Sequence, residues 1–289
     1  MDSTVGVADL HMHTVASDGT CSVNERVSQA RQRDLDAIAI TDHDSVSVDI
    51  QDRRVVADSL ELIAGVEVRA DVLDTKVELL GYYVDPDDER LTSILEEVRT
   101  YRRERNRQII DRVHETSRLD RSYADIRAEA DGILGRPHIA DVLIEEGIVD
   151  SIGAAFDEFL ANDGKAFVPM ERVPAPDVID AIQSASGVVS LAHPGRIRTE
   201  HLEGIVEKLV KHGLDGIEVQ YPYEAAPSEG YADVSVEDAA ALADEHGLLK
   251  TGGSDCHGPE SGKFRIGEVR VTQGQLEALR ERADQRRSL

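Results

Sequence analysis

Two histidines near the N-terminus have the spacing of a metal-binding pair. His11 and His13 follow the apolar run 5–8, which the pattern predicts to be a buried strand. Because side chains alternate along an extended backbone, both imidazoles should point to one face. A single pair is weak support for a metal site, but histidines and carboxylates recur after other apolar runs. The candidates so placed are His11, His13, Asp18, Asp42, His43, Glu67, His193, Asp255 and His257.

The mixture of imidazole and carboxylate groups indicates which ions could bind. Such ligands suit Mn, Fe or Zn, and a carboxylate that bridges two ions suits a centre with several metals. Cys256 lies between two candidate ligands, but the alternation should point its thiol away from them. Four other histidines lie in expected helices and are interpreted as ordinary surface or hydrogen-bonded residues: His114, His201, His212 and His246.

Strands that end in polar residues must position these ligands. Beyond the first run, apolar stretches predict strands at 36–40, 60–64, 76–83, 187–192, 215–219 and 247–251. Helical spacing predicts helices at 22–33, 49–59, 176–184, 200–212 and 236–246. Ser22 and Glu25 have the spacing of a capping box at the start of the first helix. Because parallel α/β barrels carry their chemistry at the carboxyl ends of the strands, we expect an α/β barrel.

The alternation of strands and helices is interrupted in the middle of the chain. Residues 89–161 have apolar stripes at helical spacing and no convincing strand. Short helices are expected there near 123–130, 138–146 and 152–160. We therefore predict a catalytic barrel domain formed by residues 1–86 and 165–289. Residues 87–164 should form a small, all-helical insertion domain.

The charge balance of the chain limits its partners. The 289 residues include 32 basic and 57 acidic side chains, a formal net charge of -25, which disfavours binding of a DNA duplex. The balance is typical of proteins from salt-loving microbes, although an ordinary acidic protein could share it. No run approaches the roughly 20 apolar residues of a membrane span, and no signal peptide is evident. With Cys21 and Cys256 as the only cysteines, we expect a reduced, cytoplasmic protein without a membrane partner.

Five motifs occur in the order of a known family: DLHMHT (9–14), ITDHDS (40–45), GVE (65–67), LAHPGR (191–196) and GGSDCHG (252–258). Together they resemble the polymerase and histidinol phosphatase (PHP) family, over nearly the whole chain. The resemblance implies a distorted (β/α)7 barrel, similar to a TIM barrel, that holds two or three divalent metal ions. Residues 135–138 and 163–169 resemble a branch with a helical insertion. Members of that branch remove the 3′-phosphate from nucleoside 3′,5′-bisphosphates, or degrade short 5′-phosphorylated RNA from its 5′ end.

The resemblance also implies how the ligands are divided among three ions. The first ion would take His11, His13, Glu67 and Asp255, the second Glu67 and His193, and the third Asp18, His43 and His257. One departure concerns the second ion, for which the family usually supplies a histidine where this chain has Glu78. We expect Glu78 to ligate, which would favour Mn or Mg over Zn because carboxylate oxygen is a hard ligand. The alternative is a weak second site.

The substrate-binding groups of the branch correspond to Arg136, His138, Lys165 and Arg196. Guanidinium groups fit phosphate oxygens bidentately, and an acidic protein needs such local cations to bind an anion. Arg136 and Arg196 could instead form structural ion pairs. The arginine-rich stretch 99–112 could follow a longer RNA, but we favour a solvated helix face paired with Glu96 and Glu97.

The activity implied by the resemblance is hydrolysis of phosphate esters by metal-activated water. The expected catalytic residues are His193, Asp255 and Glu67, with Mn as the expected ion and Mg, Fe or Zn as alternatives. The expected partner is a phosphorylated small molecule or a short RNA, and no oligomeric state is predicted. Competing interpretations are a histidinol-phosphate phosphatase, a non-catalytic metal-binding module and an amidohydrolase. The last usually requires a carboxylated lysine or another motif order, and the sequence has neither.

Overall fold

The computed structural model describes residues 6–129, 134–223, 232, 234–261, 263 and 265–288. The chain forms two compact units. The barrel unit comprises Met1–Glu96 and Val173–Leu289, and the helical unit comprises Glu97–Arg172. The units therefore divide after residues 96 and 172, whereas the predicted domain boundaries follow residues 86 and 164.

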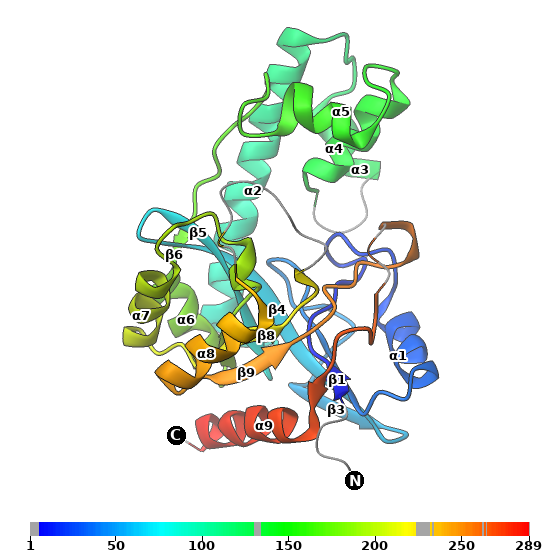
Figure 1. The fold of residues 1–289 in the computed structure, drawn as a ribbon. Coiled ribbons are helices and arrows are strands. Elements are labelled where there is room, and N and C mark those ends of the chain that lie inside the picture. Colours follow the sequence, from blue (N-terminus) through cyan, green and yellow to red (C-terminus); the bar gives the residue numbers. More distant parts are fainter. Residues whose placement is uncertain are drawn as a thin grey trace. The chain divides into compact units, whose positions relative to one another are not determined.

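A mixed sheet forms the centre of the barrel unit (Figure 1). The order of its main strands is β10 (Val271–Thr272), β1 (Gly6–Asp9), β2 (Ala37–Ile40), β4 (Leu60–Val72), β5 (Thr75–Tyr82), β7 (Val188–Leu191), β8 (Gly216–Gln220) and β9 (Leu249–Gly252). Two further strands, β3 (Arg54–Ala57) and β6 (Val173–Pro174), each pair with β4 outside this order. Strands β1, β2 and β4 are parallel, as are β7, β8 and β9, but β5 is antiparallel to β4 and to β7.

The sheet nearly closes into a barrel where the segments after β1 and β9 meet. The Leu10 amide donates a hydrogen bond of 3.1 Å to the Gly252 carbonyl, and Met12 forms a parallel bridge with Cys256. A Cβ atom on Gly253 would lie 2.3 Å from the His11 amide nitrogen, so this approach requires glycine. The expected barrel-like α/β fold is thus confirmed, with a mixed sheet in place of a purely parallel one.

Two tight hairpins cause this mixed arrangement. Asp58–Ser59 joins β3 to β4 and Leu73–Asp74 joins β4 to β5, each with two positive φ angles of 50° to 65°. Two such residues form the turn that matches the twist of paired strands. The helix expected at 49–59 is therefore wrong. Strand β3 is exposed along its whole length, so it has no buried face from which a period of two could be read.

Helices pack against the sheet of the barrel unit (Figure 1). They are α1 (Val23–Gln32), α6 (Ala175–Ser184), α7 (Leu202–Lys211), α8 (Val236–His246) and α9 (Gln273–Arg287), with short 3-10 turns at Pro194–Arg196 and Pro259–Ser261. The capping box of α1 is confirmed, because the Ser22 and Glu25 side chains each accept from the other's backbone N–H. The sequence pattern predicts four of these helices, but it does not predict α9. No helix among the described residues is long and apolar enough to cross a membrane.

The helical unit has the pattern expected for the middle of the chain. It contains most of α2 (Glu89–Thr116), followed by α3 (Tyr123–Glu129), α4 (Arg136–Glu145), α5 (Ile152–Ala155) and a π-helical turn at Phe156–Leu160. Its core includes Ile109, Leu143 and Phe159. Two arginines of the basic stretch bind backbone carbonyls within this unit: Arg105 donates to Val168 and Arg112 to Phe167.

A buried arginine joins the two chain segments that meet at the closure of the barrel. Arg26 on α1 is fully buried. Its Nε and Nη2 donate to the His13 carbonyl at 3.0 and 2.8 Å, and Nη2 also donates to the Cys256 carbonyl at 3.1 Å. Its Nη1 lies 3.2 Å from the Cys256 sulfur, so this thiol points away from the candidate ligands beside it. One guanidinium group thus satisfies carbonyls of both segments.

Replacement of this guanidinium should destabilise the barrel unit. In Arg26→Met the buried His13 carbonyl loses its donors, whereas the Cys256 carbonyl keeps the His13 amide as a donor. The free energy of unfolding should therefore fall by roughly 1–3 kcal/mol. Denaturation in urea measures the change. Arg31→Met is the matched control because Arg31 lies on the same helix in an exposed ion pair with Asp58, and it should cost at most about 1 kcal/mol. Equal effects of the two variants would contradict the role of Arg26.

Candidate metal centre

Among the residues that the structure describes, three groups of side chains have ligand atoms close enough together to hold a metal ion. They share members, so they form one continuous centre in the barrel unit. Its ligands follow β1, β2, β7 and β9, and one lies within β4, which continues beyond the expected strand at 60–64. The groups are His13, Asp18, His43 and His257; His11, His13 and Asp255; and His11, Glu67 and His193.

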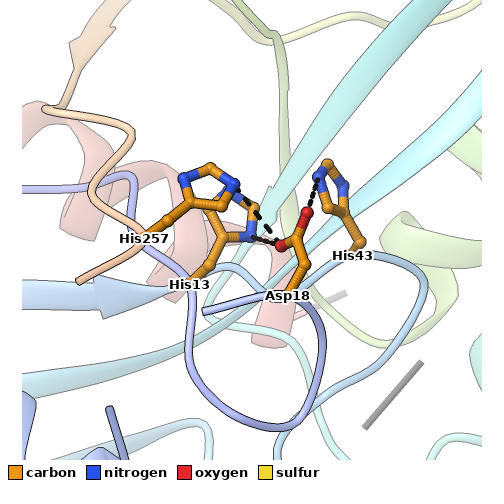
Figure 2. A group of neighbouring side chains, drawn as sticks. All are labelled: His13, Asp18, His43 and His257. Atoms are coloured by element: carbon orange, nitrogen blue, oxygen red, sulfur yellow. Dashed lines mark ion pairs between the residues drawn. The ribbon is translucent and has the colours of Figure 1, made fainter. Parts of the chain in front are cut away.

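The first group surrounds the carboxylate of Asp18, as Figure 2 shows. Asp18 Oδ1 lies 3.4 Å from His257 Nε2 and 3.9 Å from His13 Nδ1, and Oδ2 lies 3.7 Å from His43 Nε2. The rings of His13 and His257 stack with their centroids 4.2 Å apart. Three imidazole nitrogens therefore face one carboxylate, which is a ligand set for a divalent ion.

Glu67 connects the other ligands. Its Oε1 lies 2.9 Å from His193 Nε2, and its Oε2 lies 2.8 Å from His43 Nδ1 and 3.5 Å from His13 Nε2. Asp255 Oδ1 faces the same histidines, 3.2 Å from His13 Nε2. A carboxylate with both oxygens directed at different imidazoles is suited to bridge two ions.

A buried nitrogen atom supports the fit of these side chains to metal ions. Among the residues that the structure describes, Nδ1 of His13 has no hydrogen-bond partner, although buried polar atoms normally have one. In addition, Nε2 of His11 lies only 3.3 Å from Nε2 of His13. Imidazole lone pairs that converge in this way, beside carboxylates, are what a cation requires.

Glu218 supports the centre and was not identified from the sequence. It is completely buried on β8, with Oε1 2.9 Å from His11 Nδ1 and Oε2 accepting from the His193 amide at 2.7 Å. A hydrogen bond from Nδ1 leaves Nε2 of His11 directed at the centre, which is the usual arrangement behind a metal-binding histidine. The only signal in the sequence is a glutamate inside the apolar strand 215–219.

Two buried aspartates shape the loops that present the ligands. Asp42 was a candidate ligand, but its oxygens accept from the backbone and hydroxyl of Thr14 and from the Ser17 hydroxyl, at 2.6–2.7 Å. It therefore stabilises the loop that carries Asp18. Asp9, which sequence reasoning missed, accepts from the Ser254 amide and hydroxyl beside Asp255.

Two of the candidate ligands have unusual backbone conformations. His193 has φ 25° and Asp255 has φ 52°, values that are rare for residues other than glycine. Such conformations persist where the surroundings enforce them, and they occur often at functional sites. The Tyr221 hydroxyl donates to Asp255 Oδ2 at 2.9 Å, which directs the other oxygen, Oδ1, toward the histidines.

Glu78 lies at the edge of the centre, outside the three groups. Its Oε1 accepts from Arg69 at 2.8 and 3.1 Å and lies 3.0 Å from Lys76 Nζ. Its Oε2 lies 3.6 Å from His193 Nε2. The ligation expected for Glu78 stays a prediction, and the two cations beside it were not foreseen.

The expected substrate-binding residues lie in both units. In the helical unit, Arg136 donates to the Leu160 carbonyl, His138 Nδ1 accepts from the Gly135 amide at the start of α4, and Lys165 pairs with Glu158. In the barrel unit, Arg196 Nη1 donates to the Tyr221 hydroxyl at 3.1 Å. Their binding of substrate stays a prediction.

The carboxylates that face imidazoles differ electrostatically from those that support loops. Burial raises the pKa of Asp9 and Asp42 despite their hydrogen bonds. Burial alone would also raise the pKa of Asp18, Glu67 and Asp255. Neighbouring histidines outweigh it and hold these three pKa values well below the usual range, with help from Lys263 at Asp255. The centre thus keeps these three carboxylates ionised, as metal ligands must be.

The histidines also divide into two electrostatic classes. Burial, together with His257 and His43, lowers the pKa of His13 to about 3. Burial also disfavours charge on His43, but the carboxylates of Glu67 and Asp18 outweigh it and raise the pKa of His43 to about 9. His13 is therefore neutral at pH 7, whereas His43 carries a proton that a metal ion must displace.

Metal binding should consequently strengthen as the pH rises toward 9. A metal ion binds the neutral imidazole, so each displaced proton should weaken apparent Mn affinity about tenfold per pH unit below the pKa of about 9 for His43. Calorimetric titrations in buffers of different ionisation enthalpy measure both the affinity and the protons released. His43→Gln should remove only part of the dependence, because Glu218 and Glu67 outweigh burial and also hold the pKa of His11 well above its usual range. An affinity that does not change between pH 6 and 9 would contradict protonation of His43.

Comparisons with known proteins agree with this geometry. The model of the PHP domain family matches residues 9–158, just over half of the chain. The chain is 29% identical over 258 residues to the 5′-3′ exoribonuclease Rnm of Escherichia coli, covering 88% of this chain and 86% of that protein. It is 28% identical over 266 residues to the 3′,5′-nucleoside bisphosphate phosphatase of Chromobacterium violaceum, covering 90% of each.

A solved structure has the same fold over nearly the whole length. It is that of a protein from Bifidobacterium adolescentis named as a metal-dependent phosphoesterase, with a TM-score of 0.78, 29% identity and coverage of 96% of both chains. The fold, the ligand groups and the family match lead to one assignment. The chain belongs to the PHP domain family.

Proposed function

We propose that this chain is a metal-dependent phosphoesterase that acts on nucleoside 3′,5′-bisphosphates, removing the 3′-phosphate, or on short 5′-phosphorylated RNA. The observation that carries the proposal is the continuous centre of three groups, of which His13 links the first two and His11 the last two. The similar proteins from E. coli and C. violaceum are named for these two activities. Both substrates present a phosphate ester to a centre of this kind.

The side chains present would hold two or three divalent ions. His11, His13, Glu67 and Asp255 would hold the first, Glu67 and His193 the second with Glu78, and Asp18, His43 and His257 the third. Glu78 in place of a histidine favours Mn or Mg, because carboxylate oxygen is a hard ligand, and Fe or Zn are the alternatives. When bound, such ions supply charge that stabilises the phosphoryl oxygens and lower the pKa of water so that it can act as the nucleophile.

The protein contributes orientation and charge at named atoms. Glu218 holds the proton of His11 at Nδ1, so that Nε2 remains available to the centre. Tyr221 orients Asp255 through a hydrogen bond. We propose His193, Asp255 and Glu67 as the catalytic residues, because Glu67 Oε1 lies 2.9 Å from His193 Nε2 and Asp255 Oδ1 lies 3.2 Å from His13 Nε2.

Cationic side chains would bind the phosphates of the substrate. We propose Arg196 in the barrel unit, Arg136 and His138 in an insertion domain of residues 87–164, and Lys165 directly after that domain. The pair of Lys165 with Glu158 is exposed and contributes little stability, so a phosphate could replace the glutamate. The net charge of -25 makes local cations necessary for an anionic substrate, and it supports an assay at high salt, as for a protein of halophilic origin.

Release of phosphate from adenosine 3′,5′-bisphosphate tests the proposal. With Mn at high salt, the wild-type protein should release phosphate, and Asp255→Ala should lower the rate more than about 100-fold, because it removes a ligand. Asp244→Ala is the matched control, because this exposed carboxylate on α8 pairs with Lys250, and its loss should leave the rate unchanged.

Parallel assays identify the substrate. Short 5′-phosphorylated RNA and histidinol phosphate are measured with the same three proteins, and circular dichroism verifies that each is folded. If histidinol phosphate is the only substrate that is hydrolysed, the proposed substrate class is wrong. Equal rates for wild type and Asp255→Ala would contradict catalysis at this centre.

A further inference from the structure

We infer that Arg69 and Lys76 are positioning residues that turn Glu78 into a ligand of the second ion, by binding Oε1 and leaving Oε2 directed at His193. The inference rests on the proposed metal centre and deepens it. It concerns a cluster that neither the motifs nor the ligand groups include: Arg69 on β4, and Lys76 and Glu78 on β5.

The strand register places these side chains beside the centre. Glu67 pairs with Leu80, Arg69 with Glu78 and Asp71 with Lys76 across the antiparallel ladder of β4 and β5. Residues two apart on a strand share a face, so Arg69 lies on the face of Glu67. Glu78 therefore has Arg69 directly opposite and Lys76 beside it on its own strand, on the face that carries the centre.

The two carboxylate oxygens of Glu78 have different partners. Oε1 receives Arg69 Nη2 at 2.8 Å and Nε at 3.1 Å, with Lys76 Nζ 3.0 Å away. Oε2 instead lies 3.6 Å from Nε2 of His193, the atom that is 2.9 Å from Glu67 Oε1. The carboxylate is nearly buried, with 8% of the residue exposed, so its orientation is fixed by these cations.

The same division occurs at Asp255, which belongs to a ligand group. Its Oδ2 accepts from the Tyr221 hydroxyl at 2.9 Å and lies 3.5 Å from Lys263 Nζ, while Oδ1 faces His13 at 3.2 Å. Glu218 shows the contrasting arrangement, because His11 and the His193 amide occupy both of its oxygens. Glu78 has the pattern of the ligand Asp255.

Charge balance explains why two cations accompany this glutamate. Ligand carboxylates already crowd the centre, and another buried anion would be costly without compensation. Arg69 and Lys76 compensate that charge from the side of Oε1. Ligand-orienting groups of this kind typically change metal affinity by about 10- to 100-fold when removed.

The test counts bound ions without substrate, so that it is independent of hydrolysis. Mn is titrated into four metal-free proteins, and electron paramagnetic resonance follows the free ion. The proteins are wild type, Glu78→Gln, Arg69→Met and the double variant. Glu78→Gln and Arg69→Met should each weaken one class of site about tenfold or more and leave the other sites within about twofold. Lys76→Met should act in the same direction.

The double variant separates positioning from a general structural effect. If Arg69 acts through Glu78, the double variant should bind Mn like Glu78→Gln alone, because the second change has nothing left to orient. Arg54→Met is the matched control. Arg54 lies on β3 and pairs with Glu61 of β4, the strand that also carries Arg69, and its replacement should leave Mn binding at every site unchanged.

Three results would overturn the inference. Unchanged Mn binding in Glu78→Gln would show that Glu78 is not a ligand. If the wild-type protein still hydrolyses its substrate in the separate assay, the proposed function stands in that case. Tighter binding in Arg69→Met would show that the cation repels the metal. Additive losses in the double variant would show that Arg69 acts independently of Glu78.

Discussion

The centre depends on one buried carboxylate, that of Glu67. Its two oxygens contact His193, which follows β7, and His43, which follows β2, so strands from different parts of the chain meet at a single side chain. Because buried charges are tolerated only when they are paired, the surrounding imidazoles or metal ions are needed as much by the fold as by the chemistry. Glu67 can occupy this position because β4 continues well past the bridge between His43 and Glu67.

A second set of buried polar groups keeps the ligand segments in place. Arg26 binds the carbonyls of His13 and Cys256, and Asp9 binds the amide and hydroxyl of Ser254. These contacts join the segments after β1 and β9, where the sheet nearly closes. The same residues that close the barrel therefore set the distances between imidazoles and carboxylates, which links the stability of the fold to the geometry of the centre.

The side chains that come together in the three groups could be predicted from the sequence because their signal is local: histidines and carboxylates directly follow apolar runs. Asp42 shows the limit of that reasoning, since the same pattern yields a carboxylate that binds Thr14 and Ser17 instead. Glu218 and Arg26 act on partners more than 200 residues away, and no spacing rule reveals such contacts. The exposed hairpin strand β3 was missed for another reason, since it has no buried face to produce a periodic pattern. The domain boundaries and the substrate-binding residues remain predictions.

The most direct test of the central claim is anomalous X-ray scattering from crystals grown or soaked with Mn. The account predicts two or three Mn peaks in the barrel unit, among the three groups of side chains that His11 and His13 link. Peaks that lie only at exposed surface carboxylates, or no peak in crystals with ordered ligand side chains, would contradict a metal centre at this site.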